Sequence, residues 1–332
     1  MISIVIPIYN EEVLVAQLNA EIHRVMASSP EPWEVIYVND GSSDKSLELL
    51  MEIHERFPKT VVVADLSRNW GHQAAITAGV SLAKGAATII MDGDFQDPPA
   101  LIPEMVAAWK RGAEVVIARR TARNESGIRR FLFPLFYRLL GYLSDYPIPL
   151  DAGVFGLMDR RACAVISSLQ ETNRFLPGLR SWIGFRTVFI DFERPARAGG
   201  EPKQTFVRLV KYAFDAILSF SYKPLRIGLA FGVTMAFLSI VAALVLAIMR
   251  VRHLGIFRDN IVMGYASLMC TVLLMASVQL ICTGILGEYT GRIYDEVKRR
   301  PLFVIRNVLD RVCTESPQPA DLLQTPAEKA LQ

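Results

Sequence analysis

The chain has 332 residues, of which 52% are hydrophobic and 21% are charged. The hydrophobic share is too large for an ordinary soluble enzyme, and the charged share is too large for a protein that lies wholly in lipid. The net charge of +3 and four cysteines without CxxC spacing argue against a nucleic-acid-binding protein, a disulfide framework and a zinc site.

Residues 1–195 are predicted to alternate between strands and helices. Amphipathic stretches predict helices at 11–27 and 44–57. Short apolar runs predict strands at 3–8, 33–39, 61–66, 87–91 and 115–118. This order predicts an α/β fold whose mostly parallel sheet has helices on both faces, with ligands bound at the carboxyl ends of the strands.

An acidic turn follows the predicted strand at 87–91. Asp92 and Asp94 place two carboxylates there, and carboxylate oxygens suit Mg²⁺ or Mn²⁺. Taken alone, such a turn is also common as a purely structural feature. The chain has no GxGxxG and no GxxxxGK[ST] motif, which argues against dinucleotide redox chemistry and a P-loop nucleotidase.

Two long runs near the C-terminus contain no charged residue, 227–249 and 261–287. As helices each run would exceed a hydrocarbon thickness of roughly 30 Å, so we expect two transmembrane helices joined by an extracytoplasmic loop at 250–260. A buried core helix is the alternative. Nine basic residues flank the two runs and three lie in the loop between them, which predicts an integral protein of the cytoplasmic (inner) membrane with its catalytic domain and both termini in the cytoplasm.

Three further segments complete the predicted organisation. Residues 196–226 are expected to form an amphipathic juxtamembrane segment, for which a packed core helix or a subunit contact is the alternative. A cytoplasmic juxtamembrane helix is predicted at 288–310. The polar, proline-containing residues 311–332 are predicted to be a disordered tail.

Several motifs together resemble the family 2 glycosyltransferases of the GT-A fold. Their dolichyl-phosphate-sugar-synthase-like branch, which acts on polyprenyl phosphates, is the most similar, and within it the bactoprenol glucosyltransferase type with two C-terminal membrane helices. The motifs are VIPIYNEE at 5–12, VNDGSSD at 38–44, LSRNWGHQAA at 66–75, MDGDFQDPP at 91–99, IPLDAG at 148–153 and GILGEYTGRIYDEVKRRP at 284–301.

The resemblance implies roles for particular residues. The residues implied to bind the nucleotide sugar are Pro7, Tyr9, Glu11, Asp40 and Asp92. Those implied to bind the metal are Asp92, Asp94 and Gln96, and those implied in catalysis are Asp94 and Asp151. Those implied to bind phosphate or the acceptor are Arg119, Arg123, Arg197 and Lys203. The chain departs from the family pattern in two places. It has Val154-Phe155-Gly156 where Asp-Phe-Arg is usual, and Pro202 where the family has serine.

The resemblance implies inverting, Mg²⁺- or Mn²⁺-dependent transfer of a sugar, glucose from UDP-glucose in this subgroup, to polyprenyl phosphate at the cytoplasmic membrane face. A homo-oligomer is expected, and no nucleic-acid partner. Two alternatives stay open. A processive polysaccharide synthase is disfavoured because the chain lacks a QxxRW motif and further spans. A non-catalytic membrane scaffold that binds nucleotide sugar is supported only by the altered residues 154–156.

Overall fold

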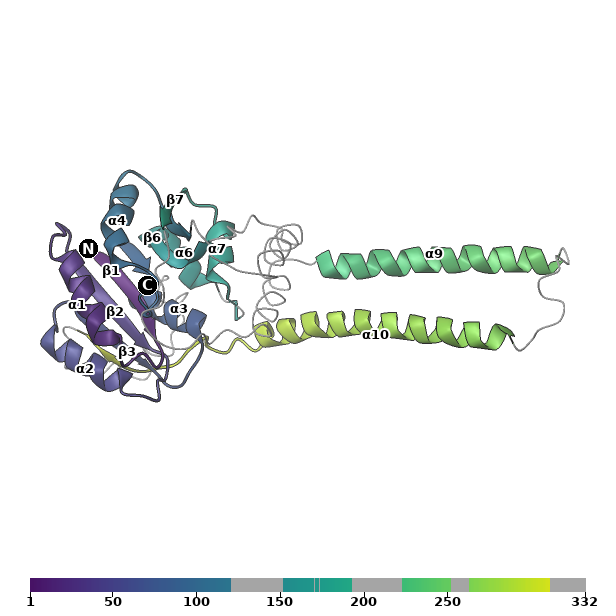
Figure 1. Cartoon of the computed structure of the whole chain (residues 1–332), viewed down its shortest axis with the longest axis horizontal. Coiled ribbons are helices and arrows are strands. Elements are labelled where there is room, and N and C mark those ends of the chain that lie inside the picture. The colour runs from purple at the N-terminus through teal and green to yellow at the C-terminus, as the bar shows by residue number, and fades with distance from the viewer. Residues whose placement is uncertain (121–151, 170, 173, 193–222, 252–262, 311–332) are drawn as a thin grey trace, which may run out of the picture.

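The computed structural model describes residues 1–120, 152–169, 171–172, 174–192, 223–251 and 263–310. Within them, one eight-stranded sheet has the strand order β7-β5-β6-β4-β1-β2-β3-β8. Figure 1 shows this sheet and its helices as one domain, from which two long helices extend side by side.

The sheet is mostly parallel. Strand β1 pairs in parallel with β2 and β4, β2 with β3, and β5 with β7. Strand β6 is antiparallel to β4 and β5, and β8 is antiparallel to β3. The strands are β1 Ile2–Ile8, β2 Trp33–Asn39, β3 Val61–Leu66, β4 Ala87–Ile90, β5 Val115–Arg120, β6 Ala152–Asp159, β7 Thr187–Phe192 and β8 Ile305–Leu309.

Helices cover both faces of the sheet because its central strands are apolar on both sides. In β1, Ile4 and Ile6 pack into one buried cluster and Val5 packs into the other. The first cluster includes side chains of α1 Val15–Met26, α2 Ser46–Arg56 and α4 Ile102–Lys110, which follows the short helix η1 Pro99–Leu101; the second includes α3 His72–Leu82, α6 Arg160–Ser168 and α7 Leu176–Trp182.

The predicted α/β class and mostly parallel sheet are confirmed. Each strand predicted from an apolar run is present, with bounds that differ by at most a few residues. Strands β6, β7 and β8 were not predicted, and two of them bring the antiparallel pairs into the sheet. Strands β7 and β8 are the two edges of the sheet, where a continuous apolar run is not required, and their sequences mix polar and apolar residues, whereas β6 lies inside the sheet between β5 and β4.

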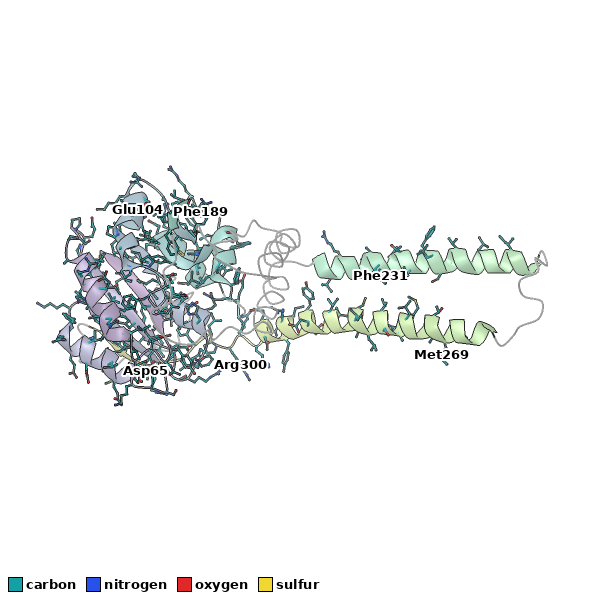
Figure 2. All side chains as sticks on the ribbon, viewed as in Figure 1. Asp65, Glu104, Phe189, Phe231, Met269 and Arg300 are labelled. Atoms are coloured by element: carbon teal, nitrogen blue, oxygen red, sulfur yellow. The ribbon has the colours of Figure 1, made fainter. Side chains whose placement is uncertain are left out.

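The C-terminal third differs from the predicted division. The apolar runs form α9 Lys223–Val251 and α10 Met263–Val297, which run side by side, but no separate helix covers 288–310. Instead α10 continues through its charged last turns, and β8 returns to the sheet beside β3. Figure 2 shows the side chains along both helices, with Phe231 of α9 and Met269 of α10 labelled far from the sheet.

The predicted membrane localisation is wrong, and one finding contradicts it. In the part of the chain that the structure describes, no helix combines the length and the apolar character needed to span a bilayer.

Candidate active site

A cleft of about 270 Å³ opens at the carboxyl ends of β1, β2 and β4. Parallel strands end at the same edge of a sheet, so the polar residues that follow each of them converge there. The described residues lining the cleft are Pro7, Ile8, Tyr9, Glu11, Asp40, Asn69, Gly71, His72, Asp92, Gly93 and Asp94. The structure thus brings together Pro7, Tyr9, Glu11, Asp40, Asp92 and Asp94, all of which the sequence predicted as site residues.

The loops after β1 and β2 are joined by hydrogen bonds. The Asn10 amide N–H donates to Ser42 Oγ at 3.1 Å, and the Glu11 N–H donates to Ser46 Oγ at 2.9 Å. In return, the Ser43 N–H donates to Asn10 Oδ1 at 2.8 Å. Asn10 has a left-handed φ of 54°, which asparagine tolerates better than most residues. These bonds hold the two loops as one wall of the cleft.

Asp40 organises the entry to α3. Its carboxylate is 3% exposed and accepts the backbone N–H of Trp70 at 2.7 Å and that of Gly71 at 3.0 Å. Burial raises the pKa of Asp40, and the two N–H groups only partly oppose this. Because each carboxylate oxygen accepts one of these bonds, the observed role of Asp40 is to hold the turn before α3. Its assignment to nucleotide-sugar binding remains a prediction.

Gly41 follows Asp40 at a position that only glycine fits. Its φ is +65°, and a Cβ built there would lie 2.5 Å from Arg68 C and Asn69 N, which are backbone atoms. We expect Gly41→Ala to lower the free energy of unfolding by about 2–4 kcal/mol, measured by urea denaturation, because it adds a steric clash to left-handed strain.

Gly184 provides the matched control for this prediction. It has a similar φ of +68°, but a Cβ there would meet nothing within 4 Å. Gly184→Ala should therefore cost only the backbone strain, about 1 kcal/mol. Equal losses in the two variants would contradict the close approach of the loops after β2 and β3.

The acidic turn after β4 has a defined backbone. Asp97, which is 1% exposed, accepts the Asp92 N–H through Oδ2 at 3.0 Å. Asp94 Oδ1 accepts the Gln96 N–H at 3.1 Å, and Phe95 has a left-handed φ of 61°. The turn therefore presents Asp92 and Asp94 to the cleft. The sequence predicted no role for Asp97, and the described lining does not include Gln96.

The donor chemistry of the cleft fits a divalent cation completed by a substrate. Among the described residues no group of three histidine, cysteine, aspartate or glutamate side chains is arranged to hold a metal ion. Asp92 and Asp94 both line the cleft, however, and Mg²⁺ is usually held by one or two carboxylates together with substrate phosphates and water. Two aspartates are therefore a sufficient protein contribution for such a cation.

His72 lines the cleft and was not predicted as a site residue. It begins α3, and its Nε2 lies 3.3 Å from Asp92 Oδ1 while its side chain stays 41% exposed. Burial acts to lower its pKa, but the bond to Asp92 and the charges of Asp92, Asp40 and Asp97 outweigh this and raise the pKa. His72 is the one basic side chain in the described lining.

Of the predicted acceptor-side residues, the structure describes only Arg119. Arg119, on β5, donates from Nε and Nη2 to the carboxylate of Asp191 at 2.6 and 2.9 Å. It does not belong to the described lining, and its predicted role is untested. The other predicted residues lie outside the described part of the chain: Asp151, Arg123, Arg197 and Lys203.

Comparison with known proteins shows extensive similarity along the sequence. The family described as Glycosyl transferase family 2 matches residues 3–166. "Uncharacterized glycosyltransferase YkcC" of Bacillus subtilis is 41% identical, over 92% of this chain and 93% of that protein. "Bactoprenol glucosyl transferase" of Shigella phage SfV is 36% identical, over 92% of this chain and 98% of the relative.

Solved structures are less similar. Mannosyl-3-phosphoglycerate synthase from Rubrobacter xylanophilus has a TM-score of 0.44 and 16% identity, covering 79% of this chain and 78% of that one. The sequence relatives therefore carry the family assignment.

Proposed function

The chain belongs to glycosyltransferase family 2 and is a glycosyltransferase, and we propose that it transfers glucose from UDP-glucose to a polyprenyl phosphate. The proposed reaction inverts the anomeric centre and depends on Mg²⁺ or Mn²⁺, on a catalytic unit of the GT-A type. Support for the sugar and the lipid comes from the relative named "Bactoprenol glucosyl transferase", which aligns with 92% of this chain.

The observation that carries the proposal is the meeting of three loops at one cleft. Tyr9 and Glu11 come from the loop after β1, Asp40 from the loop after β2, and Asp92 and Asp94 from the turn after β4. A site for a nucleotide sugar needs a wall of residues that contacts the nucleoside and a positive charge that neutralises the diphosphate. The joined loops after β1 and β2 supply the wall, and the acidic turn supplies the cation-binding oxygens.

The charge of the cleft explains why a cation belongs there. Glu11, Asp40, Asp92 and Asp94 are acidic, so the lining alone would repel a diphosphate. A divalent cation held by Asp92 and Asp94 would act as a Lewis acid toward the departing nucleoside diphosphate. The protein itself contributes orientation, through the hydrogen-bonded turn that places both aspartates at the cleft.

The acceptor sets a different requirement from a sugar hydroxyl. A phosphate monoester is already an oxyanion at neutral pH, so removing a proton is a minor problem. Bringing two anions together is the harder one, and arginine pairs well with phosphate oxygens. We assign this work to Arg119, Arg123, Arg197 and Lys203, and we assign to Asp151 the positioning or polarisation of the acceptor.

A transfer assay tests the proposal. Purified protein is incubated with polyprenyl phosphate, Mg²⁺ or Mn²⁺, and one labelled donor at a time from a panel that includes UDP-glucose, UDP-N-acetylglucosamine and GDP-mannose. We expect organic-extractable label with UDP-glucose, and a β-linked product from the α-linked donor. Label that stays in the aqueous phase with every donor would contradict the proposed reaction.

A further inference from the structure

The strand that follows α10 carries an arginine into the sheet. Strand β8 lies antiparallel to β3, and Figure 2 labels Asp65 on β3 and Arg300 on the segment returning from α10. Arg306 Nη1 donates to Asp65 Oδ2 at 3.1 Å, and its Nη2 donates to the Ser67 carbonyl oxygen at 2.8 Å. Asp65 is only 7% exposed, so this guanidinium is a substantial part of the compensation for a buried carboxylate.

Asp65 also forms a hydrogen bond to a residue of β2. Its other oxygen, Oδ1, accepts from Asn39 Nδ2 at 2.7 Å, and Asn39 is 1% exposed. An ionised carboxylate can only accept hydrogen bonds, so Asp65 forces the NH₂ group of Asn39 toward itself. The Asn39 carbonyl oxygen is thereby turned the other way, where it accepts the Ser42 N–H at 3.2 Å.

The last link is a loop that lines the cleft. Ser42 lies two residues after Asp40, and its Oγ accepts the Asn10 N–H that joins the loops after β1 and β2. A continuous series of hydrogen bonds therefore runs from Arg306 through Asp65 and Asn39 to this cleft wall. Arg306 and Asp65, the first pair in this series, are 241 positions apart in the sequence. No local sequence pattern therefore indicates the series.

We propose that Arg306 is a positioning residue for donor binding, which acts through Asp65 and Asn39 on the loop after β2. The inference rests on the proposed function, because it assigns that loop to the nucleotide sugar. It makes β8 part of the donor site, although 112 residues, positions 193–304, separate β8 from β7, the preceding strand in the described structure. A purely structural Arg306 would only attach β8 to the sheet edge.

The test compares Arg306→Met with Lys84→Met. Lys84 pairs with Asp310, so it also attaches the end of β8 to the domain but makes no contact with Asp65 or Asn39. We expect Arg306→Met to weaken UDP binding in the presence of Mn²⁺ by about tenfold and to raise the donor KM similarly, with little change in kcat, since one charge-assisted contact is lost. Lys84→Met should leave both values unchanged.

Hydrogen–deuterium exchange supplies a readout without ligand. In Arg306→Met, a peptide covering residues 39–46 should exchange faster than in the wild-type protein, and Arg306→Lys should recover part of the protection because it keeps the charge. Unchanged UDP binding in Arg306→Met, or equal effects of Arg306→Met and Lys84→Met, would overturn the positioning role of Arg306 and leave the proposed function standing. A wild-type protein that binds no UDP would overturn the proposed function, and the donor role of Arg306 with it.

Discussion

Replacing Asp94 by asparagine is expected to reduce the rate of sugar transfer by about 10³-fold, or ~4 kcal/mol of transition-state stabilisation, while the protein stays folded. Asparagine keeps an oxygen that can accept the Gln96 N–H, which Asp94 Oδ1 accepts at 3.1 Å, so the turn itself should survive. What is lost is the negative charge that would hold a cation at the cleft. The measurement is the initial rate of formation of labelled, organic-extractable lipid.

The control for Asp94→Asn removes an aspartate that lies away from the cleft. Asp310 pairs with Lys84 beside the end of β8 and does not line the cleft in the described structure. Asp310→Asn should leave the transfer rate within about twofold, as expected of a surface pair. A near-normal rate in Asp94→Asn at saturating cation and donor would contradict the assignment of the acidic turn to the diphosphate.

Replacing Asp151 by asparagine should also abolish most of the turnover, by about 10²- to 10⁴-fold, but through the acceptor step. Asp151 lies outside the described residues and directly precedes β6. Because we assign it to the acceptor and not to the donor, UDP binding in the presence of Mn²⁺ should be unchanged. The measurement pairs kcat with the dissociation constant for UDP.

The start of β6 has an unusual buried support. Arg180 of α7 is 1% exposed and donates from Nη1 to the Val154 carbonyl oxygen at 3.0 Å, and from Nη2 to the Gly153 carbonyl oxygen. Burial lowers the pKa of Arg180 to about 10. Gly156 leaves space for this side chain, since a Cβ there would lie 2.4 Å from the Val116 carbonyl oxygen and 3.0 Å from Arg180 Nη1. The backbone that follows Asp151 is therefore firmly held.

Asp159, at the other end of β6, is the matched control for Asp151. It caps α6 by accepting the Arg161 N–H at 3.0 Å and also accepts from Trp109 Nε1 at 2.9 Å. Asp159→Asn should reduce stability by about 1 kcal/mol, because the single oxygen of the amide can replace only one of these two acceptors, and should leave turnover intact. Near-normal turnover in Asp151→Asn would remove Asp151 from the reaction centre.

Much of the site could be predicted because a parallel sheet follows a simple spatial rule. The apolar runs that form β1, β2 and β4 identified three strand ends, and the rule that these ends meet placed Tyr9, Glu11, Asp40, Asp92 and Asp94 together. The residues did not have to be neighbours in the chain. They only had to follow strands that a run of buried aliphatic residues makes recognisable.

The residues that were missed depend on contacts that no local pattern encodes. His72 opens a helix, and only the folded chain brings its imidazole 3.3 Å from Asp92. Asp97 is buried beneath the turn that it supports, although its type suggested a surface residue. Strand β8 mixes apolar and polar residues after a long helix, so its pairing with β3 is set by tertiary structure.

The membrane prediction was wrong, because no helix in the described part of the chain is both long enough and apolar enough to span a bilayer. The helices α9 and α10 do form over the two uncharged runs. The positions of both helices were thus predictable from the sequence.

The most direct test of the account is a calorimetric titration of UDP into the wild-type protein and into Asp94→Asn, each with Mn²⁺ and with a chelator. We predict that the wild-type protein binds UDP only when the cation is present, and that Asp94→Asn loses this cation-dependent binding. Binding of UDP that is equally tight in the chelator, or equally tight in the two proteins, would contradict a cation-dependent diphosphate site at the acidic turn.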